Sequence, residues 1–350
     1  MRAGLVIYGD LDQTSGGYLY DRMMVREMER RGHQVRVVSQ ERRDYLGNLA
    51  DNFSPSMCRR LRDEFDLLLE DELNHPSLFH LNERLRKEAS YPIVSIVHHL
   101  SRSAALTEGE RSMYGFFESH YLATVDAFVF NSRATMESVA ELLDGDPRGV
   151  IAPPGKDHVT VREGHRPPAP PLRILYVGNV LPHKGLEVLV EALGMAGGEF
   201  TLDVVGSRPD PEYADRVMER VKVHDLEDRV RWLGPLGQEG LCHLFREDHL
   251  LAVPSFHEGY GIAYVEALAH GMPVIATSSG GPREIITHGK EGFLVDPGDS
   301  QYLSDLLGRL ISDPDLLGRR GEEASERYRE LPTWGESMGR AVDFLESMVD

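Results

Sequence analysis

Short apolar runs that alternate with amphipathic helical segments constrain the fold of this chain more than any other feature. Four runs in the first half each predict a short buried strand: LVIY (5–8), VRVVS (35–39), PIVSIVHH (92–99) and DAFVFNS (126–132). A glycine turn at Gly16 and Gly17 and a helical pattern over 19–31 separate the first two runs. Buried strands joined by helices are typical of a parallel sheet covered on both faces. We therefore predict a doubly wound α/β domain here.

A proline-rich segment, GHRPPAPP (164–171), interrupts the alternation, because prolines resist both a helix and a central strand. Beyond it the pattern restarts with six predicted strands and three predicted helices: strands over 172–178, 200–206, 230–234, 250–255, 273–277 and 292–295, and helices over 185–195, 211–224 and 262–269. We predict a second doubly wound domain, with the first over 1–165 and the second over 166–333. A ligand cleft is expected between the carboxyl ends of their strands. The final helical segment, 334–350, is expected to pack back on the first domain.

Composition excludes several classes of protein. The 350 residues are 41% hydrophobic, enough for two cores, and the net charge of -19 opposes binding to nucleic acid. Only Cys58 and Cys242 are present, too few for a disulfide framework. The N-terminus resembles no signal peptide, and no run approaches the roughly 18 to 20 apolar residues of a membrane span. The expected compartment is the cytoplasm.

One basic segment runs against the acidic balance. Residues 56–62, SMCRRLR, place three arginines beside Met57 and Leu61. Such a segment suits peripheral contact with the inner face of a membrane or with an acidic acceptor. The simpler interpretation is a solvated helix face.

Two glutamates flank a glycine-rich turn in the stretch HEGYGIAYVEALAHG (257–271). Gly259 and Gly261 allow a tight turn that exposes the first N–H groups of the following helix, those of Ile262 and Ala263, to a phosphate. Helical spacing places Ile262, Val265, Leu268 and Ala269 on a buried stripe, and Ala263, Glu266 and His270 on another face.

Carboxylates are good acceptors for paired sugar hydroxyls. We therefore expect a nucleotide diphosphate sugar whose transferred sugar meets Glu258 and whose ribose meets Glu266. The simpler interpretation is that Glu258 caps the helix and Glu266 is solvated.

At this point the sequence resembles the retaining glycosyltransferases of family four, which have the two-Rossmann GT-B fold. The paired glutamates, eight positions apart, match that family's motif. Further matching segments follow one another over essentially the whole chain: GGY (16–18), VHH (97–99), FNSRAT (130–135), APPGKD (152–157), LYVGNVLPHKG (175–185), EGYGIAYVEALAHGMPVIATSSGGPREII (258–286) and GKEGFLVDPGD (289–299).

The resemblance implies roles for individual residues. Gly16 and Gly17 would bring backbone to the donor phosphate, His98 would lie near the transferred sugar, and Lys184 would hold the diphosphate. Each has a plainer interpretation: a tight turn, a hydrogen-bonded strand-end histidine and the start of a helix. The family usually has arginine after Gly178, where this chain has Asn179, which still donates to a phosphate oxygen but carries no charge. His183 or Arg208 would restore that charge.

The implied activity is transfer of a sugar with retention of configuration to an acceptor hydroxyl on a glycan, lipid or small molecule. UDP-glucose is weakly favoured over GDP-mannose as donor. In the family the departing diphosphate accepts the acceptor's proton, so the protein stabilises charge and orients the sugar. This chemistry needs neither metal nor cofactor, and the sequence has no suitably placed Asp-x-Asp pair.

Other functions remain as alternatives. A dehydrogenase is disfavoured because GYGIAY lacks the third glycine of the dinucleotide fingerprint, and a P-loop enzyme because GNVLPHKG has the lysine before the glycine. A GT-B epimerase or a phosphorylase-like enzyme would use a similar site. A non-catalytic sugar-binding protein with two lobes is the alternative outside enzymes.

Overall fold

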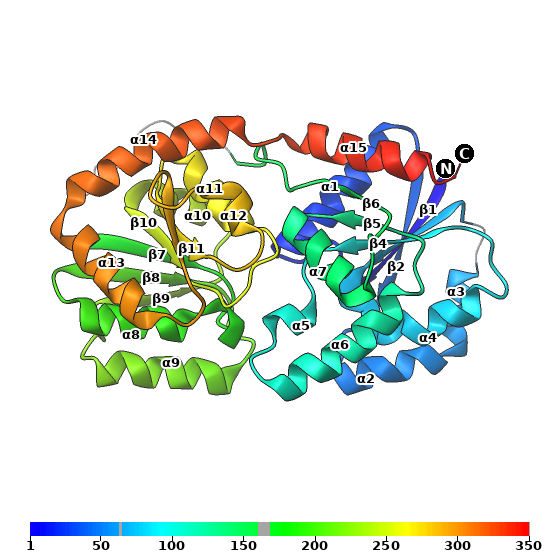
Figure 1. The fold of residues 1–350 in the computed structure, drawn as a ribbon, viewed down its shortest axis with the longest axis horizontal. Helices are drawn as coiled ribbons and strands as arrows, with labels where there is room; N and C mark the ends of the chain where they lie inside the picture. Colours follow the sequence, from blue (N-terminus) through cyan, green and yellow to red (C-terminus); the bar gives the residue numbers. More distant parts are fainter. Residues whose placement is uncertain (63–64, 160–168, 350) are drawn as a thin grey trace. The chain divides into compact units, whose positions relative to one another are not determined.

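The computed structural model describes residues 1–62, 65–159 and 169–349, which form two compact units (Figure 1). Unit 1 comprises Met1–Gly155 and Pro332–Asp350, and unit 2 comprises Lys156–Leu331. The boundary expected at residue 165 and the first part of the proline-rich segment lie outside the described residues.

Unit 1 is built on a six-stranded, all-parallel sheet with the strand order β2-β1-β3-β4-β5-β6. Its strands are β1 (Arg2–Tyr8), β2 (Gln34–Gln40), β3 (Leu67–Asp71), β4 (Ile93–Val97), β5 (Ala127–Phe130) and β6 (Gly149–Ile151). The predicted strands of the first half are confirmed, but the sequence interpretation omitted the edge strand β6 and the central strand β3. Its sequence, LLLED, is short and ends in acidic residues that are themselves buried.

Helices cover both faces of this sheet. They are α1 (Gly16–Arg30), α2 (Tyr45–Leu49), η1 (Ala50–Phe53), α3 (Pro55–Leu61), η2 (Glu72–Asn74), α4 (His75–Leu85), α5 (Ser101–Ala104), α6 (Glu108–Leu122), α7 (Arg133–Leu143) and α15 (Trp334–Glu346). In Figure 1, α1 and α15 lie on one side and α4 and α6 on the other.

The expected glycine turn before α1 is wrong. Ser15 is the N-cap, and its side chain accepts a hydrogen bond from Tyr18 N, so the helix starts at Gly16. Gly16 and Gly17 are therefore the first two helical residues, and the helix begins three residues earlier than predicted.

The final helix belongs to unit 1. Residues of α15 contact α1 and β6. Arg31, just after α1, donates to Asp343 Oδ1 at 2.6 Å and to the carbonyl of Gly339 at 2.9 Å. Tyr20 of α1 lies edge-on to Trp334 with ring centroids 5.9 Å apart. These contacts fix α15 on the surface of α1.

Helix α3 contains most of the basic segment 56–62. Met57 and Leu61 are buried in the core of unit 1, so they do not form an apolar face for a membrane. Arg60 donates to the carbonyl of Ser39, and Arg62 pairs with Glu88. Among the described helices, none combines the length and hydropathy that crossing a membrane requires.

Unit 2 contains a second six-stranded, all-parallel sheet, with the order β12-β11-β10-β7-β8-β9. Its strands are β7 (Leu172–Val177), β8 (Phe200–Val205), β9 (Val230–Gly234), β10 (Leu250–Val253), β11 (Val274–Thr277) and β12 (Gly292–Val295). All six predicted strands are present with ends within two residues of the prediction. The predicted fold class, two doubly wound parallel α/β sheets, is confirmed.

The helices of unit 2 again cover both faces. They are η3 (Pro182–Lys184), α8 (Leu186–Ala196), α9 (Pro211–Val223), α10 (Gln238–Glu247), α11 (Ile262–Ala269), α12 (Pro282–Ile285), α13 (Ser300–Ser312) and α14 (Pro314–Glu330). Figure 1 shows α8 and α9 on one side of the sheet and α11 and α14 on the other.

Helix α11 is more buried than its predicted amphipathic pattern. Tyr264 and Ala267 are buried in addition to the predicted stripe, Ile262 is only half-buried, and His270 is buried against Phe245. The difference arises because α11 packs under α14 as well as on the sheet.

Candidate functional site

The strand order of unit 2 reverses between β7 and β10, and ligands of open α/β sheets bind at the carboxyl ends of strands at such a reversal. The segments that follow these two strands are joined directly. Phe256 N donates to the carbonyl of His183 at 2.7 Å. Gly185, with φ of 71°, lies so close to Pro254 that an added Cβ would stand 2.0 Å from its carbonyl oxygen. The two loops therefore form one continuous surface.

Lys184 and Glu258, from these two loops, form an ion pair. Lys184 Nζ lies 2.6 Å from Glu258 Oε2, and the side chains are 24% and 18% exposed. The structure therefore brings together the residue expected to hold the diphosphate and the residue expected to hold the sugar. Both remain reachable from solvent.

The loop after β11 fixes the backbone of Glu258. Gly281 N donates to the Glu258 carbonyl at 3.0 Å, and Glu258 N donates to the Ser279 carbonyl at 3.3 Å. Gly280 has φ of 90°, and a Cβ there would stand 2.1 Å from the Glu258 carbonyl oxygen. The sequence analysis assigned no role to this loop, although two successive glycines after a strand were a usable signal.

Gly261 is the N-cap of α11, with φ of 105°. This left-handed conformation favours glycine, and a Cβ would stand 2.2 Å from the Tyr264 ring. Tyr264 Oη donates to the carbonyl of Val253 at 3.0 Å, which holds the ring in that place. The predicted tight turn is therefore present. The N–H groups of Ile262 and Ala263 lie in the first turn of α11, where N–H groups take no part in intrahelical hydrogen bonds. Such groups bind anions at helix N-termini.

Glu266 is half-buried on α11 and faces a histidine that the sequence analysis overlooked. His158 Nε2 lies 3.3 Å from Glu266 Oε1. No local pattern around His158 indicated this contact, because the two residues are 108 positions apart in the sequence.

The residue at the family's arginine position and the two residues expected to restore its charge lie in different environments. Asn179 is exposed, and its Oδ1 accepts a hydrogen bond from Ser207 Oγ at 2.7 Å. Arg208 lies over the ring of Trp232, with its guanidinium carbon 4.6 Å from the centroid. Burial and the neighbouring Lys184 lower the pKa of His183 to about 4. His183 is therefore neutral near pH 7 and adds no charge.

In unit 1, His98 follows β4 and lies against the start of α1. A Cβ on Gly17 would stand 3.3 Å from His98 Cδ2, so the absence of a side chain admits the imidazole. His98 Nε2 lies 3.2 Å from Asp21 Oδ1, and Tyr20 contacts the ring edge-on. Gly16, one residue earlier, opens the same helix.

His98 is 7% exposed and its charge is stabilised by carboxylates. Burial opposes the imidazolium, but the neighbouring carboxylates of Asp21, Asp71 and Glu72 outweigh it and raise the pKa of His98 to about 9. Replacing His98 would leave Asp21, itself fully buried, without its imidazolium partner, so we expect the change to destabilise unit 1.

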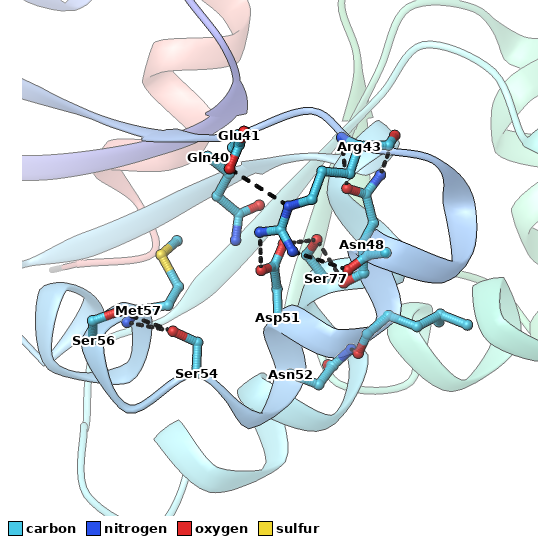
Figure 2. A network of polar contacts seen from close by, with 12 residues as sticks. Gln40, Glu41, Arg43, Asn48, Asp51, Asn52, Ser54, Ser56, Met57 and Ser77 are labelled. Carbon is cyan, nitrogen blue, oxygen red and sulfur yellow. Dashed lines mark hydrogen bonds and ion pairs between the residues drawn. The ribbon is translucent and has the colours of Figure 1, made fainter.

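The loop after β2 is ordered by a polar network at the carboxyl edge of the unit 1 sheet (Figure 2). Arg43 Nη2 donates to Asp51 Oδ1 at 2.6 Å, and Ser77 Oγ donates to Asp51 Oδ2 at 3.0 Å. Asn48 Oδ1 accepts from Arg43 N at 3.1 Å. The network ties the segment 41–54 to the start of α4. This is one of the regions where the sequence offered no transferable motif.

Comparison with known sequences identifies the type of domain in unit 2. Residues 159–327 match the family model described as Glycosyl transferases group 1. Two similar curated proteins are D-inositol 3-phosphate glycosyltransferases. The protein from Nocardia farcinica is 31% identical over 255 residues, and the protein from Xylanimonas cellulosilytica is 30% identical over 274 residues. The alignments cover 67% and 72% of this chain, and 56% and 65% of those relatives' own lengths.

Comparison with solved structures shows the same fold over the whole chain. Sucrose-phosphate synthase (tll1590) from Thermosynechococcus elongatus superposes with a TM-score of 0.83 at 20% identity, covering 99% of this chain and 98% of that one. The Anabaena protein Alr3699/HepE, in complex with UDP-glucose, gives a TM-score of 0.75 at 17% identity, covering 99% and 100%. The two parallel sheets with their helices match these GT-B structures.

Proposed function

We propose that this protein is a retaining glycosyltransferase that moves a sugar from a nucleotide diphosphate sugar to an acceptor hydroxyl. The observation that carries the proposal is the Lys184–Glu258 pair at the strand-order reversal of unit 2. A cation for a diphosphate and a carboxylate for sugar hydroxyls meet at the position where such sheets bind ligands. The group 1 match over 159–327 and the names of the relatives support the reaction class.

Charge on the leaving diphosphate is stabilised, in our proposal, by Lys184 and by the N-terminus of α11. When the diphosphate binds, the ammonium of Lys184 is shared between it and Glu258. The N–H groups of Ile262 and Ala263 add donors without a charged side chain. Because these groups are fixed before substrate arrives, they stabilise the developing charge with little rearrangement. The diphosphate then needs no metal ion and the enzyme no cofactor.

The two carboxylates act on different parts of one donor. Glu258 accepts hydrogen bonds from the transferred sugar. Its backbone is fixed by hydrogen bonds with Ser279 and Gly281. Glu266, on α11, accepts from the ribose hydroxyls and exchanges its contact with His158 for them. Asn179 contributes a neutral donor on the diphosphate side.

In unit 1, we assign a substrate contact to His98, with Gly16 and Gly17 as the backbone beside it. With a pKa of about 9, His98 is an imidazolium at neutral pH, and both ring nitrogens then donate. Nε2 donates to Asp21 Oδ1, so we assign the N–H at Nδ1 to the substrate.

UDP-glucose is the donor that we propose first. The Anabaena HepE structures hold UDP-glucose or UDP and glucose, which supports a uridine donor on this fold. The relatives' name, D-inositol 3-phosphate glycosyltransferase, supports a hydroxyl acceptor.

A thermal-shift screen of UDP, GDP and ADP sugars tests the proposal. A donor at 100 times its dissociation constant adds about 2.7 kcal/mol to the free energy of unfolding, which is readily measured. We expect the largest shift with UDP-glucose and a smaller one with UDP alone. Failure of every nucleotide sugar to stabilise the protein would contradict the proposal.

Product analysis then separates transfer from related reactions. Donor and acceptor together should yield a product with the donor's anomeric configuration, as read by NMR. A changed sugar from donor alone would identify an epimerase instead. Turnover should persist when a chelator is added at the start of the assay, because Lys184 and α11 neutralise the diphosphate.

A further inference from the structure

A group of metal-ligating side chains lies inside unit 1 and includes none of the residues assigned to the transfer reaction. Glu72, His75 and Glu118 come from η2, α4 and α6, and their ligand atoms lie within 4.8 Å of one another. All three side chains are essentially inaccessible to solvent. The sequence analysis assigned no metal ligands and expected the transfer reaction to need no metal.

The carboxylate of Glu72 is the most unusual member of the group. Neither of its oxygens accepts a hydrogen bond from any described residue. His75 Nδ1 lies 3.1 Å from Glu72 Oε1, but it is equally 3.1 Å from the carbonyl oxygen of Glu72, to which a proton on Nδ1 is directed. A buried carboxylate without donors is costly, so this arrangement indicates a missing positive partner.

The other two side chains are held in place by partners outside the group. His75 Nε2 lies 2.9 Å from Tyr45 Oη. Glu118 Oε1 accepts from Ser101 N at 2.5 Å, and Oε2 accepts from Arg102 N at 3.3 Å. Contacts of this kind orient metal ligands in proteins. When an ion binds, the single proton of His75 lies on Nε2 and is donated to Tyr45 Oη, which frees Nδ1 from the Glu72 carbonyl for the ion.

The spacing fits an ion. Two ligand atoms about 2.1 Å from a cation and at right angles to each other are about 3 Å apart, using the usual metal–ligand distances. The 3.1 Å between His75 Nδ1 and Glu72 Oε1 agrees with this span. An organic ligand fits less well, because these side chains are so buried that solvent does not reach them.

We propose that Glu72, His75 and Glu118 bind one divalent cation that stabilises unit 1. Two carboxylates neutralise its charge, and the imidazole nitrogen favours a transition metal, Zn²⁺ first and Mn²⁺ second, over Mg²⁺ or Ca²⁺. The ion connects η2 and α4, which follow the central strand β3, to α6. None of its ligands is a residue assigned to the transfer reaction, and the proposed site does not depend on the proposed function.

The alternative is that the carboxyl groups share protons and hold no ion. Substitution of Glu72 separates the two states, because its effects in them differ. With an ion, Glu72→Gln removes a ligand and lowers the unfolding temperature. Without an ion, a protonated Glu72 is already neutral, and the same change leaves the unfolding temperature nearly unchanged.

Metal content of the full-length protein is the first measurement. After expression with added Zn²⁺ or Mn²⁺ and desalting, we expect about one ion per chain in the wild type. In Glu72→Gln and in Glu118→Gln the content should fall at least about tenfold. Glu70→Gln is the matched control: Glu70 is a fully buried carboxyl on β3, bonded to Asn82 rather than to this group, and its loss should leave the ion in place.

A second measurement needs no variant and covers the case in which one fails to fold. Protein unfolded in chelator and refolded without metal should gain unfolding temperature when Zn²⁺ or Mn²⁺ is added alone. Refolded with Co²⁺, it should show the visible absorption of a site with nitrogen and oxygen ligands. A wild type that binds no ion under these conditions, or a Glu72→Gln protein that binds as much as the wild type, would overturn the proposal.

Discussion

The two units place carboxylates at corresponding points of two similar sheets but treat them differently. In unit 2 the strand order reverses between β7 and β10, where Glu258 is partly exposed and faces Lys184. In unit 1 it reverses between β1 and β3, where Asp71 and Glu72 are buried, and no described residue donates a hydrogen bond to the Glu72 carboxylate. A solvent-accessible carboxylate can exchange its ion-pair partner for a ligand. A buried carboxylate needs a partner that stays in place. The same topology therefore supports a substrate site in unit 2 and a structural ion in unit 1.

Removing the positive charge of Lys184 in unit 2 gives the largest expected effect. Lys184→Ala should lower turnover by about a thousandfold, because one preorganised positive charge on the leaving diphosphate is lost. Steady-state kinetics with the donor identified by the screen measures the change. Lys222→Ala, on exposed α9, is the matched control and should be near wild type. A Lys184→Ala protein with full activity would show that the diphosphate binds elsewhere.

The two glutamates of unit 2 should differ from each other. Glu258→Ala should lower turnover by about a hundredfold while nucleotide diphosphate affinity changes little, since its assigned contact is the sugar. Glu266→Ala should weaken nucleotide and nucleotide sugar alike by about tenfold, the value of a charged hydrogen bond. Calorimetry with UDP and kinetics with the donor measure both. Equal losses of UDP affinity in the two variants would refute the division of roles.

His98 in unit 1 should couple rate to stability, unlike the residues of unit 2. His98→Ala lowers turnover and also destabilises the protein by about 3 kcal/mol, because Asp21 is left buried without its imidazolium. Denaturant unfolding and kinetics test this together. His99→Ala, at the next and more exposed position, should affect turnover much less. The reverse ranking of turnover would move the substrate contact to His99.

A charge added to the unit 2 site should have a moderate effect. Asn179→Arg should tighten UDP binding by roughly 1 kcal/mol, about fivefold, as a charge-assisted bond replaces a neutral one. Asn179 is exposed, so the longer side chain has room, although the bond from Ser207 is lost. Unchanged affinity by calorimetry would mean that position 179 does not face the diphosphate.

The smallest effect concerns pH and His183. Its pKa is lowered to about 4 in the folded protein from an ordinary value near 6.5, so the folded state binds fewer protons than the unfolded one between those values. The stability that comes from keeping His183 neutral is present above pH 6.5 and is lost as pH falls towards 4. His183→Gln should therefore lose less stability between pH 7 and 5 than the wild type. An identical loss in thermal unfolding would argue that His183 titrates normally.

Much of the site in unit 2 followed from local sequence. Gly261 and the eight residues of α11 were predicted because glycine allows a tight turn and the apolar residues that follow recur at helical spacing. His98 was placed correctly at the end of a strand, but its burial against Asp21 was not visible. Glu72 was missed because an acidic run after three leucines looks like the start of a solvated loop.

The sequence by itself determined the fold class, most of the strands and several of the helices, because hydrophobic periodicity and capping residues act over a few positions. Only the tertiary structure decided which of these side chains meet. Lys184 and Glu258 are 74 positions apart, and they meet because β7 and β10 are neighbours in the sheet. Glu72 and Glu118 come together because α4 packs against α6. Such pairings depend on strand order and helix packing, which no local pattern encodes, and they decide whether a carboxylate is reachable or buried.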